Sequence, residues 1–139
     1  DLSPYTLDLC RCINMATIVH FDLPAEDLER AASFYGKLFG WKFERMPGPI
    51  EYFGITTFDE QGRPSLGGGM GKKNEWDTGI TNYVGVSSVE DTLKSLVELG
   101  GKMVLPRTEV GEFGYLAVCL DPEGNKFGLW ENKPNAPER

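Results

Sequence analysis

The chain has 139 residues, with 40% hydrophobic and 25% charged side chains, a composition typical of one soluble globular domain with its own core. No apolar run approaches the roughly 20 residues that a membrane-spanning helix needs, so a membrane protein is not expected. The formal net charge of −7 argues against a nucleic acid partner, because phosphate backbones are bound by cationic surfaces.

The two ends of the chain and its cysteines give further expectations. Cys10, Cys12 and Cys119 are too few for a disulfide framework, and the first two have no evident partners for a zinc site. A reducing, cytoplasmic location is therefore expected. Residues 1–14 precede Met15, match no later pattern and lack the features of a secretory signal, so we expect a non-native leader there, with a native arm as the alternative. Residues 134–139 are expected to form a short tail.

The first half of the chain predicts one helix and four strands. An apolar run with β-branched residues predicts a strand over residues 16–23. Apolar side chains then recur every three or four positions from Leu28 to Phe39, which predicts a helix that ends at Gly40. Turn residues separate three further predicted strands, over residues 41–45, 52–58 and 65–70.

The second half repeats this order. After a polar linker over residues 71–79, a strand is predicted over residues 82–86, and Ser88 with Asp91 resembles a helix N-cap. A helical stripe and three strands follow, and the halves align at a near-constant spacing that pairs His20 with Asn82. The sequence therefore predicts an α+β fold of two tandem βαβββ modules, about residues 15–70 and 80–133, within one domain over residues 15–133. The three last predicted strands cover residues 102–105, 115–120 and 127–130.

Two stretches of the sequence carry motifs of a known family. The N-terminal stretch contains His20–Leu23, Asp27–Arg30, Phe34–Tyr35 and Leu38–Trp41, and the C-terminal stretch is Asp121–Glu131. Both resemble the glyoxalase, bleomycin-resistance and extradiol dioxygenase superfamily, the vicinal oxygen chelate fold. The resemblance implies a sheet that bears an open cleft, a small-molecule ligand and a homodimer.

The resemblance also locates the metal-ligand positions of metal-using relatives. They fall on His20, on Asn82, on Gly128 and near Gly67. Nickel, zinc or iron needs three or four imidazole, carboxylate or thiolate donors, and this chain has a single histidine. No metal cofactor is expected, and neither are glyoxalase I or dioxygenase activities by the routes those families use. The alternative is a rebuilt metal site that draws on Asp22, Glu51, Glu109 or Glu112.

Three positions carry the hypothesis of a ligand site. His20 should share a face with Asp22 and act as a ligand contact or a general base, or else as a hydrogen-bonded histidine without catalytic duty. Trp130 shares the strand parity of Gly128, so its indole could stack on a flat ligand in the space that glycine leaves, or fill its own cavity. Gly67 could permit close approach of the backbone to a ligand.

The sequence thus favours a metal-independent small-molecule-binding protein, with His20, Asn82, Gly128, Trp130 and Gly67 around the ligand. One alternative is a lyase or isomerase of glyoxalase type in which His20 acts as acid or base, or belongs to a rebuilt metal site. A second alternative is a structural or regulatory module whose own aromatic side chains close the cleft.

Overall fold

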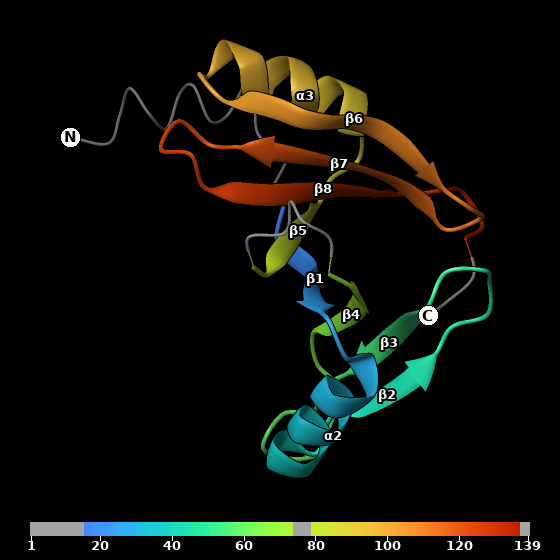
Figure 1. Ribbon diagram of the computed structural model, residues 1–139. Coiled ribbons are helices and arrows are strands. Elements are labelled where there is room, and N and C mark those ends of the chain that lie inside the picture. Colours follow the sequence, from blue (N-terminus) through green and yellow to red (C-terminus); the bar gives the residue numbers. More distant parts are fainter. Residues whose placement is uncertain (1–15, 74–78, 137–139) are drawn as a thin grey trace. The chain divides into compact units, whose positions relative to one another are not determined.

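The structure is a computed structural model that describes residues 16–73 and 79–136 (Figure 1). The predicted leader, Cys10 and Cys12, most of the predicted linker and the last three residues of the tail lie outside the described residues. The chain divides into two compact units, one spanning Ile18–Asn82 and the other beginning at Tyr83; we call them the N-terminal unit and the C-terminal unit. Within the described ranges, no helix is long and apolar enough to cross a membrane.

The N-terminal unit is a four-stranded sheet with one helix. Its elements are β1 (Ile18–Ala25), α2 (Leu28–Phe39), β2 (Lys42–Arg45), β3 (Tyr52–Thr56) and β4 (Gly67–Lys72). The strand order is β2-β3-β4-β1; β1 runs parallel to β4, and the other neighbours are antiparallel. The Asp27 side chain caps the N-terminus of α2 through the backbone N–H of Arg30, and Gly40 ends the helix at a φ of 75°.

The C-terminal unit repeats this topology. Its elements are β5 (Thr81–Gly85), α3 (Val89–Glu98), β6 (Lys102–Val110), β7 (Gly114–Leu120) and β8 (Lys126–Asn132). The order is β5-β8-β7-β6, with β5 parallel to β8 and the remaining pairs antiparallel. Ser88 caps α3 by accepting from the backbone N–H of Asp91, as its sequence predicts. The predicted α+β fold and its repeated βαβββ order are therefore confirmed.

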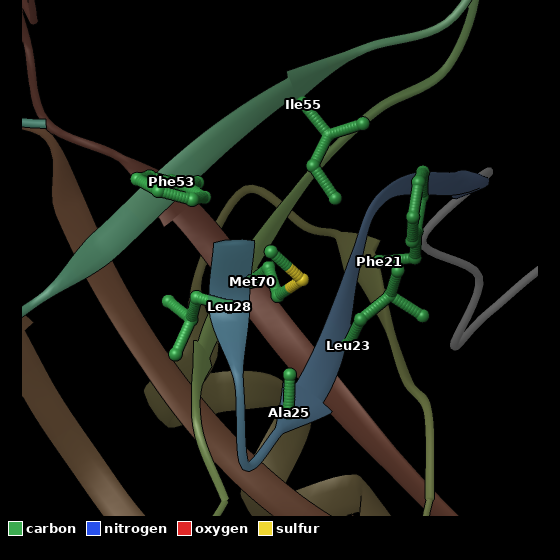
Figure 2. Close-up of a cluster of buried hydrophobic side chains, with 7 residues drawn as sticks. All are labelled: Phe21, Leu23, Ala25, Leu28, Phe53, Ile55 and Met70. Atoms are coloured by element: carbon green, nitrogen blue, oxygen red, sulfur yellow. The ribbon is translucent and has the colours of Figure 1, made fainter. Parts of the chain in front are cut away.

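The core of the N-terminal unit lies between α2 and one face of its sheet (Figure 2). Strand alternation sends every second residue of β1 to this face. The predicted helix stripe is correct over its first two turns, where Leu28 is buried, but Leu38 and Phe39 are 57% and 56% exposed. The buried cluster consists of Phe21, Leu23, Ala25, Leu28, Phe53, Ile55 and Met70.

The C-terminal unit has a separate core beneath α3. It contains Val89, Leu93, Ala117, Cys119 and Leu129. Glu131 follows on β8, and its Oε1 accepts a hydrogen bond from the backbone N–H of Val89 at 2.9 Å. A carboxylate at the first turn of a helix satisfies an unpaired donor and favours the positive end of the helix dipole. This contact fixes α3 to β8.

One strand is longer than its sequence indicates. The predicted strand over residues 102–105 stops before Pro106, whereas β6 continues to Val110. Proline has no N–H to donate, but an edge strand needs only one hydrogen-bonded side, and β6 is the edge of its unit's sheet. The register of β6 against β7 shifts between Met103 and Leu105 and again between Leu105 and Thr108, so irregular pairing accommodates the proline.

Candidate functional site

A cluster of three polar side chains lies on the sheet face of the N-terminal unit that points away from α2. Phe21 and Leu23 of β1 enter the core, so the alternate residues His20 and Asp22 occupy the opposite face, as predicted. The Nε2 atom of His20 lies 2.9 Å from Oδ1 of Asp22. The Tyr52 hydroxyl, from β3, donates to the same oxygen at 2.7 Å. We call these residues the polar cluster.

The hydrogen-bond directions in the polar cluster follow from the carboxylate. An ionised carboxylate can only accept, so the His20 nitrogen that faces Asp22 carries a proton. In the neutral tautomer with this proton, the lone pair is on the other ring nitrogen, Nδ1. The Tyr52 hydroxyl also lies 3.4 Å from His20 Nε2. His20 is thus oriented by Asp22 and Tyr52, and its Nε2 is engaged within the protein.

Exposure differs within the cluster. The His20 side chain is only 10% exposed, whereas that of Asp22 is 32% exposed. Burying an imidazole and a phenol is tolerated because both form hydrogen bonds. The carboxylate of Asp22 is therefore more accessible to solvent, or to a ligand, than the imidazole of His20.

Two glycines of β4 lie beside the polar cluster, on the strand next to β1. The register pairs His20 with Gly67 and Asp22 with Gly69. A side chain on Gly69 would overlap the Tyr52 ring, so this glycine is what allows Tyr52 to reach Asp22. At Gly67 an added Cβ would meet only the Ile55 carbonyl oxygen, at 3.5 Å, which is ordinary contact. Of these two glycines, Gly67 has space for an added group and Gly69 does not.

Tyr83, rather than Asn82, lies on the face of the C-terminal unit that corresponds to the face of His20. In the parallel pairs, His20 lies opposite Gly67 and Tyr83 lies opposite Gly128. Val84 packs on the core beneath α3, as Phe21 packs beneath α2, so its neighbour Tyr83 points away from the core, as His20 does. Asn82 is exposed and, by alternation, lies on the same face as Val84. Asn82 therefore lies on the face opposite to the one expected from its alignment with His20.

The space beside Gly128 is occupied. A side chain there would overlap the Tyr83 ring, which is 8% exposed, so the gap predicted for a ligand is filled by tyrosine. Trp130 lies on the same face as Gly128, as predicted, and is also 8% exposed. Its indole Nε1 donates to Oδ1 of Asn132 at 2.7 Å, which fixes the ring orientation.

The donor atoms on these strands do not suit a transition metal. Over residues 16–73 and 79–136, no group of three or more His, Cys, Asp or Glu side chains gathers closely enough to hold an ion. His20 and Asp22 supply two donors, and they are hydrogen bonded to each other. Zinc or iron sites need at least three protein ligands.

Two acidic residues of the alternative metal site pair with basic side chains of their own units. Glu51 is 3.8 Å from the Arg45 guanidinium, in the N-terminal unit. Glu109, in the C-terminal unit, is paired with Lys133, whose hydrogen bond and charge lower the pKa of that carboxyl. Glu112 is exposed. Among the described residues, these carboxylates belong to no group of three or more that could hold an ion.

Cys119 is a core residue, as the sequence indicates. It is fully buried beneath α3, and burial raises the pKa of its thiol to about 11. A thiol with so high a pKa is almost entirely protonated at neutral pH and is a poor nucleophile. It takes no part in the candidate site.

Strand parity placed Asp22 on the face of His20, but the sequence named it only for the alternative metal site. Tyr52 was not assigned to the site, because its approach depends on β4 lying between β1 and β3 with glycine at the crossing point. Tyr83 was not singled out, because its contact with Gly128 depends on the pairing of β5 with β8.

The chain resembles known proteins in sequence. The model of one family, the bleomycin resistance protein-like N-terminal family, matches residues 17–57. A glyoxylase-like domain-containing protein from Didymella fabae is 34% identical over 112 residues, covering 78% of this chain and 88% of the relative. Proteins named "Putative glyoxylase CFP32" in Mycobacterium bovis and Mycobacterium tuberculosis are 27% identical over 117 residues. That match covers 79% of this chain, but the chain spans only 43% of the length of these mycobacterial relatives.

Solved structures share its fold. A hypothetical protein from Bacillus halodurans superposes with a TM-score of 0.66 at 14% identity, covering 89% of this chain and 99% of the other. A methylmalonyl-CoA epimerase from Streptomyces coelicolor, solved with 2-nitronate-propionyl-CoA, gives a TM-score of 0.63 at 14% identity, covering 84% and 97%. At such identities the likeness concerns the fold alone.

Proposed function

Because the chain belongs to the glyoxalase and bleomycin-resistance superfamily, we propose that it binds a small molecule, without a metal ion, on the sheet face that carries the polar cluster. The observation that supports this proposal is the hydrogen-bonded set of His20, Asp22 and Tyr52 beside the bare backbone at Gly67. A few fixed polar groups next to an uncrowded surface are what orients a small ligand.

A second candidate function is supported by the same contacts. An imidazole in hydrogen-bond contact with a carboxylate, and close to a phenol, is an arrangement suited to proton transfer. In this alternative the protein is a lyase or isomerase in which His20 acts as acid or base through Nδ1. The methylmalonyl-CoA epimerase shares only its fold with this chain, so the activity of that enzyme does not favour either of the two functions.

The two functions differ in what His20→Ala does. As a binding protein, the chain is expected to take up one ligand per site without turnover. The His20→Ala variant is then expected to weaken ligand binding about five- to tenfold, because the hydrogen bond from His20 no longer holds Asp22 in place. Binding is measured by isothermal titration against metabolites that co-purify with the untagged protein. Turnover of a bound compound that the variant abolishes would instead establish the enzyme.

Metal content is the control for this experiment. Elemental analysis of untagged protein purified without chelator is expected to give well under one metal ion per chain, because His20 and Asp22 belong to no group of three or more possible ligands within residues 16–73 and 79–136. A stoichiometric metal that disappears in His20→Ala would contradict the metal-independent proposal.

We further propose that the protein is a homodimer. Strand β6 is the edge of its sheet, and its Met103 and Val104 side chains are 49% and 57% exposed. Apolar side chains along an unpaired edge favour association with another copy. Light scattering at micromolar concentration is expected to give twice the chain mass of 15.5 kDa. A monomer mass that persists up to 100 micromolar, about a hundredfold higher, would contradict the dimer.

A further inference from the structure

Two cationic side chains lie against one tyrosine ring in the C-terminal unit. The guanidinium carbon of Arg107, from β6, is 3.7 Å from the centroid of the Tyr115 ring of β7, and Nζ of Lys133, which follows β8, is 5.3 Å from it. Glu109 pairs with Tyr115 across the two strands, so both side chains lie on the face of the sheet that packs beneath α3 (Figure 1). We call these four residues the charged group.

Within the charged group, Lys133 and Glu109 neutralise each other. Nζ of Lys133 donates to Oε2 of Glu109 and, at 2.7 Å, to the carbonyl oxygen of Gly111. The hydrogen bond and the charge of Lys133 are the largest causes of the lowered pKa of the Glu109 carboxyl, and the charge of Arg107 adds a smaller contribution. The carboxylate of the group is therefore held by the lysine rather than by the arginine.

The N–H groups of Arg107 remain available. Within residues 16–73 and 79–136, its guanidinium forms no hydrogen bond and no ion pair, and its direct contact is with the Tyr115 ring. Arg107 is exposed. Stacking uses the flat face of a guanidinium and leaves its in-plane N–H donors for another acceptor. Paired donors of this kind match two oxygens of a carboxylate or a phosphate, and a guanidinium that is already held flat loses less freedom on binding.

We propose that Arg107 binds the oxyanion, a carboxylate or a phosphate, of a small molecule. Lys133 is a positioning residue, because it holds the Glu109 carboxylate that would otherwise compete for the guanidinium. The inference goes beyond the proposed function, since the polar cluster belongs to the N-terminal unit and takes no part here. Side chains stand on the faces of a sheet, so association of two copies through the edge of β6 leaves Arg107 accessible.

Inorganic phosphate and acetate are the probes that test the proposal. Each is titrated into the full chain at constant ionic strength, with chloride as the replaced anion, and NMR follows the amides and the arginine Nε–Hε groups. Both probes are expected to bind saturably, with millimolar dissociation constants and shifts centred on Arg107 and on β6 and β7. The probe that binds more tightly identifies whether the small molecule carries a phosphate or a carboxylate; either result supports the proposal.

Matched variants test the role of the guanidinium. Arg107→Lys keeps the charge but not the paired donors, and is expected to weaken binding of the tighter probe by about fivefold or more. Tyr115→Leu removes the stacking that orients the guanidinium and is expected to weaken it about two- to fivefold. Arg63→Lys makes the first substitution at an exposed arginine that is paired with Asp59, and is expected to leave the affinity unchanged.

The positioning role of Lys133 has a separate test. Lys133→Gln is expected to weaken binding, because it frees the Glu109 carboxylate to pair with Arg107. Adding Glu109→Gln to this variant is expected to restore the affinity. Adding Glu112→Gln instead restores the same net charge from the neighbouring exposed turn, but it leaves Glu109 in place and is not expected to restore the affinity. Equal rescue by the two glutamate substitutions would overturn the positioning role.

Contrary outcomes for the site itself are distinct from failure of the proposed function. Unchanged affinity in folded Arg107→Lys, with folding measured by circular dichroism, would show that charge alone attracts the anion and would overturn the proposal. If that variant does not fold, shifts spread equally over the other arginine Nε–Hε groups of the unmodified protein overturn it. Shifts confined to β1 and β4 would also overturn it, while small-molecule binding at the polar cluster would stand.

Discussion

Replacing Met70 with alanine is expected to lower the free energy of unfolding by about 2–5 kcal/mol. Met70 is completely buried where β4 meets α2, among the side chains of Phe21, Phe53 and Leu28 (Figure 2). Removing the thioether takes away apolar contacts and leaves a cavity that packed neighbours fill only in part. Urea denaturation followed by circular dichroism measures the change.

Met103→Ala is the matched control for this prediction. It makes the same substitution on β6, where the side chain is 49% exposed, and is expected to change stability by less than about 0.5 kcal/mol. Equal losses from Met70→Ala and Met103→Ala would show that α2 does not cover β4 in the way described.

Replacing Gly128 with alanine is expected to destabilise the protein by about 1–3 kcal/mol. The new methyl group would overlap the Tyr83 ring, which is buried and has little room to withdraw. The effect is on folding, in contrast to the sequence-based expectation that Gly128 leaves space for a ligand. Thermal or urea unfolding of the variant measures it.

Gly67→Ala is the control, because Gly67 is likewise a glycine on the last strand of its unit. Its added Cβ would make only ordinary contact with the Ile55 carbonyl, so its stability is expected to stay within about 0.5 kcal/mol of the original protein. A second test combines Gly128→Ala with Tyr83→Ala: the glycine substitution should cost less once the ring is gone. A full, additive cost in the double variant would contradict the overlap.

The contacts of the polar cluster indicate a different role for His20 from the metal-ligand role that its sequence position suggests. In metal-using relatives, as the family resemblance implies, that position supplies a metal ligand. Here the Nε2 nitrogen faces Asp22 and holds a carboxylate that is more exposed than the histidine itself. In the C-terminal unit the Tyr83 ring covers Gly128, whereas a Cβ on Gly67 in the N-terminal unit would meet no ring.

The sequence by itself determined the secondary structure and the repeat. Leu28 and the residues spaced three and four positions after it can be buried together only on a helix, and Asp27 and Gly40 supply its ends. Alternation along β1 likewise separates Phe21 from His20 without reference to any other strand. These signals are local, because each depends on the geometry of a single element. They were sufficient for the α+β fold and for the face on which His20 lies.

Only the tertiary structure decided the register and the contacts between strands. A one-residue error in register moves a side chain to the opposite face, and strand alternation places Asn82 on the face opposite to the one expected. The approach of Tyr52 to Asp22 requires β4 between their strands and no side chain at Gly69. Residues 30 positions apart along the chain make this contact, and no local pattern records which of them meet. The sequence therefore identified the histidine, and the pairing of strands decided which groups surround it.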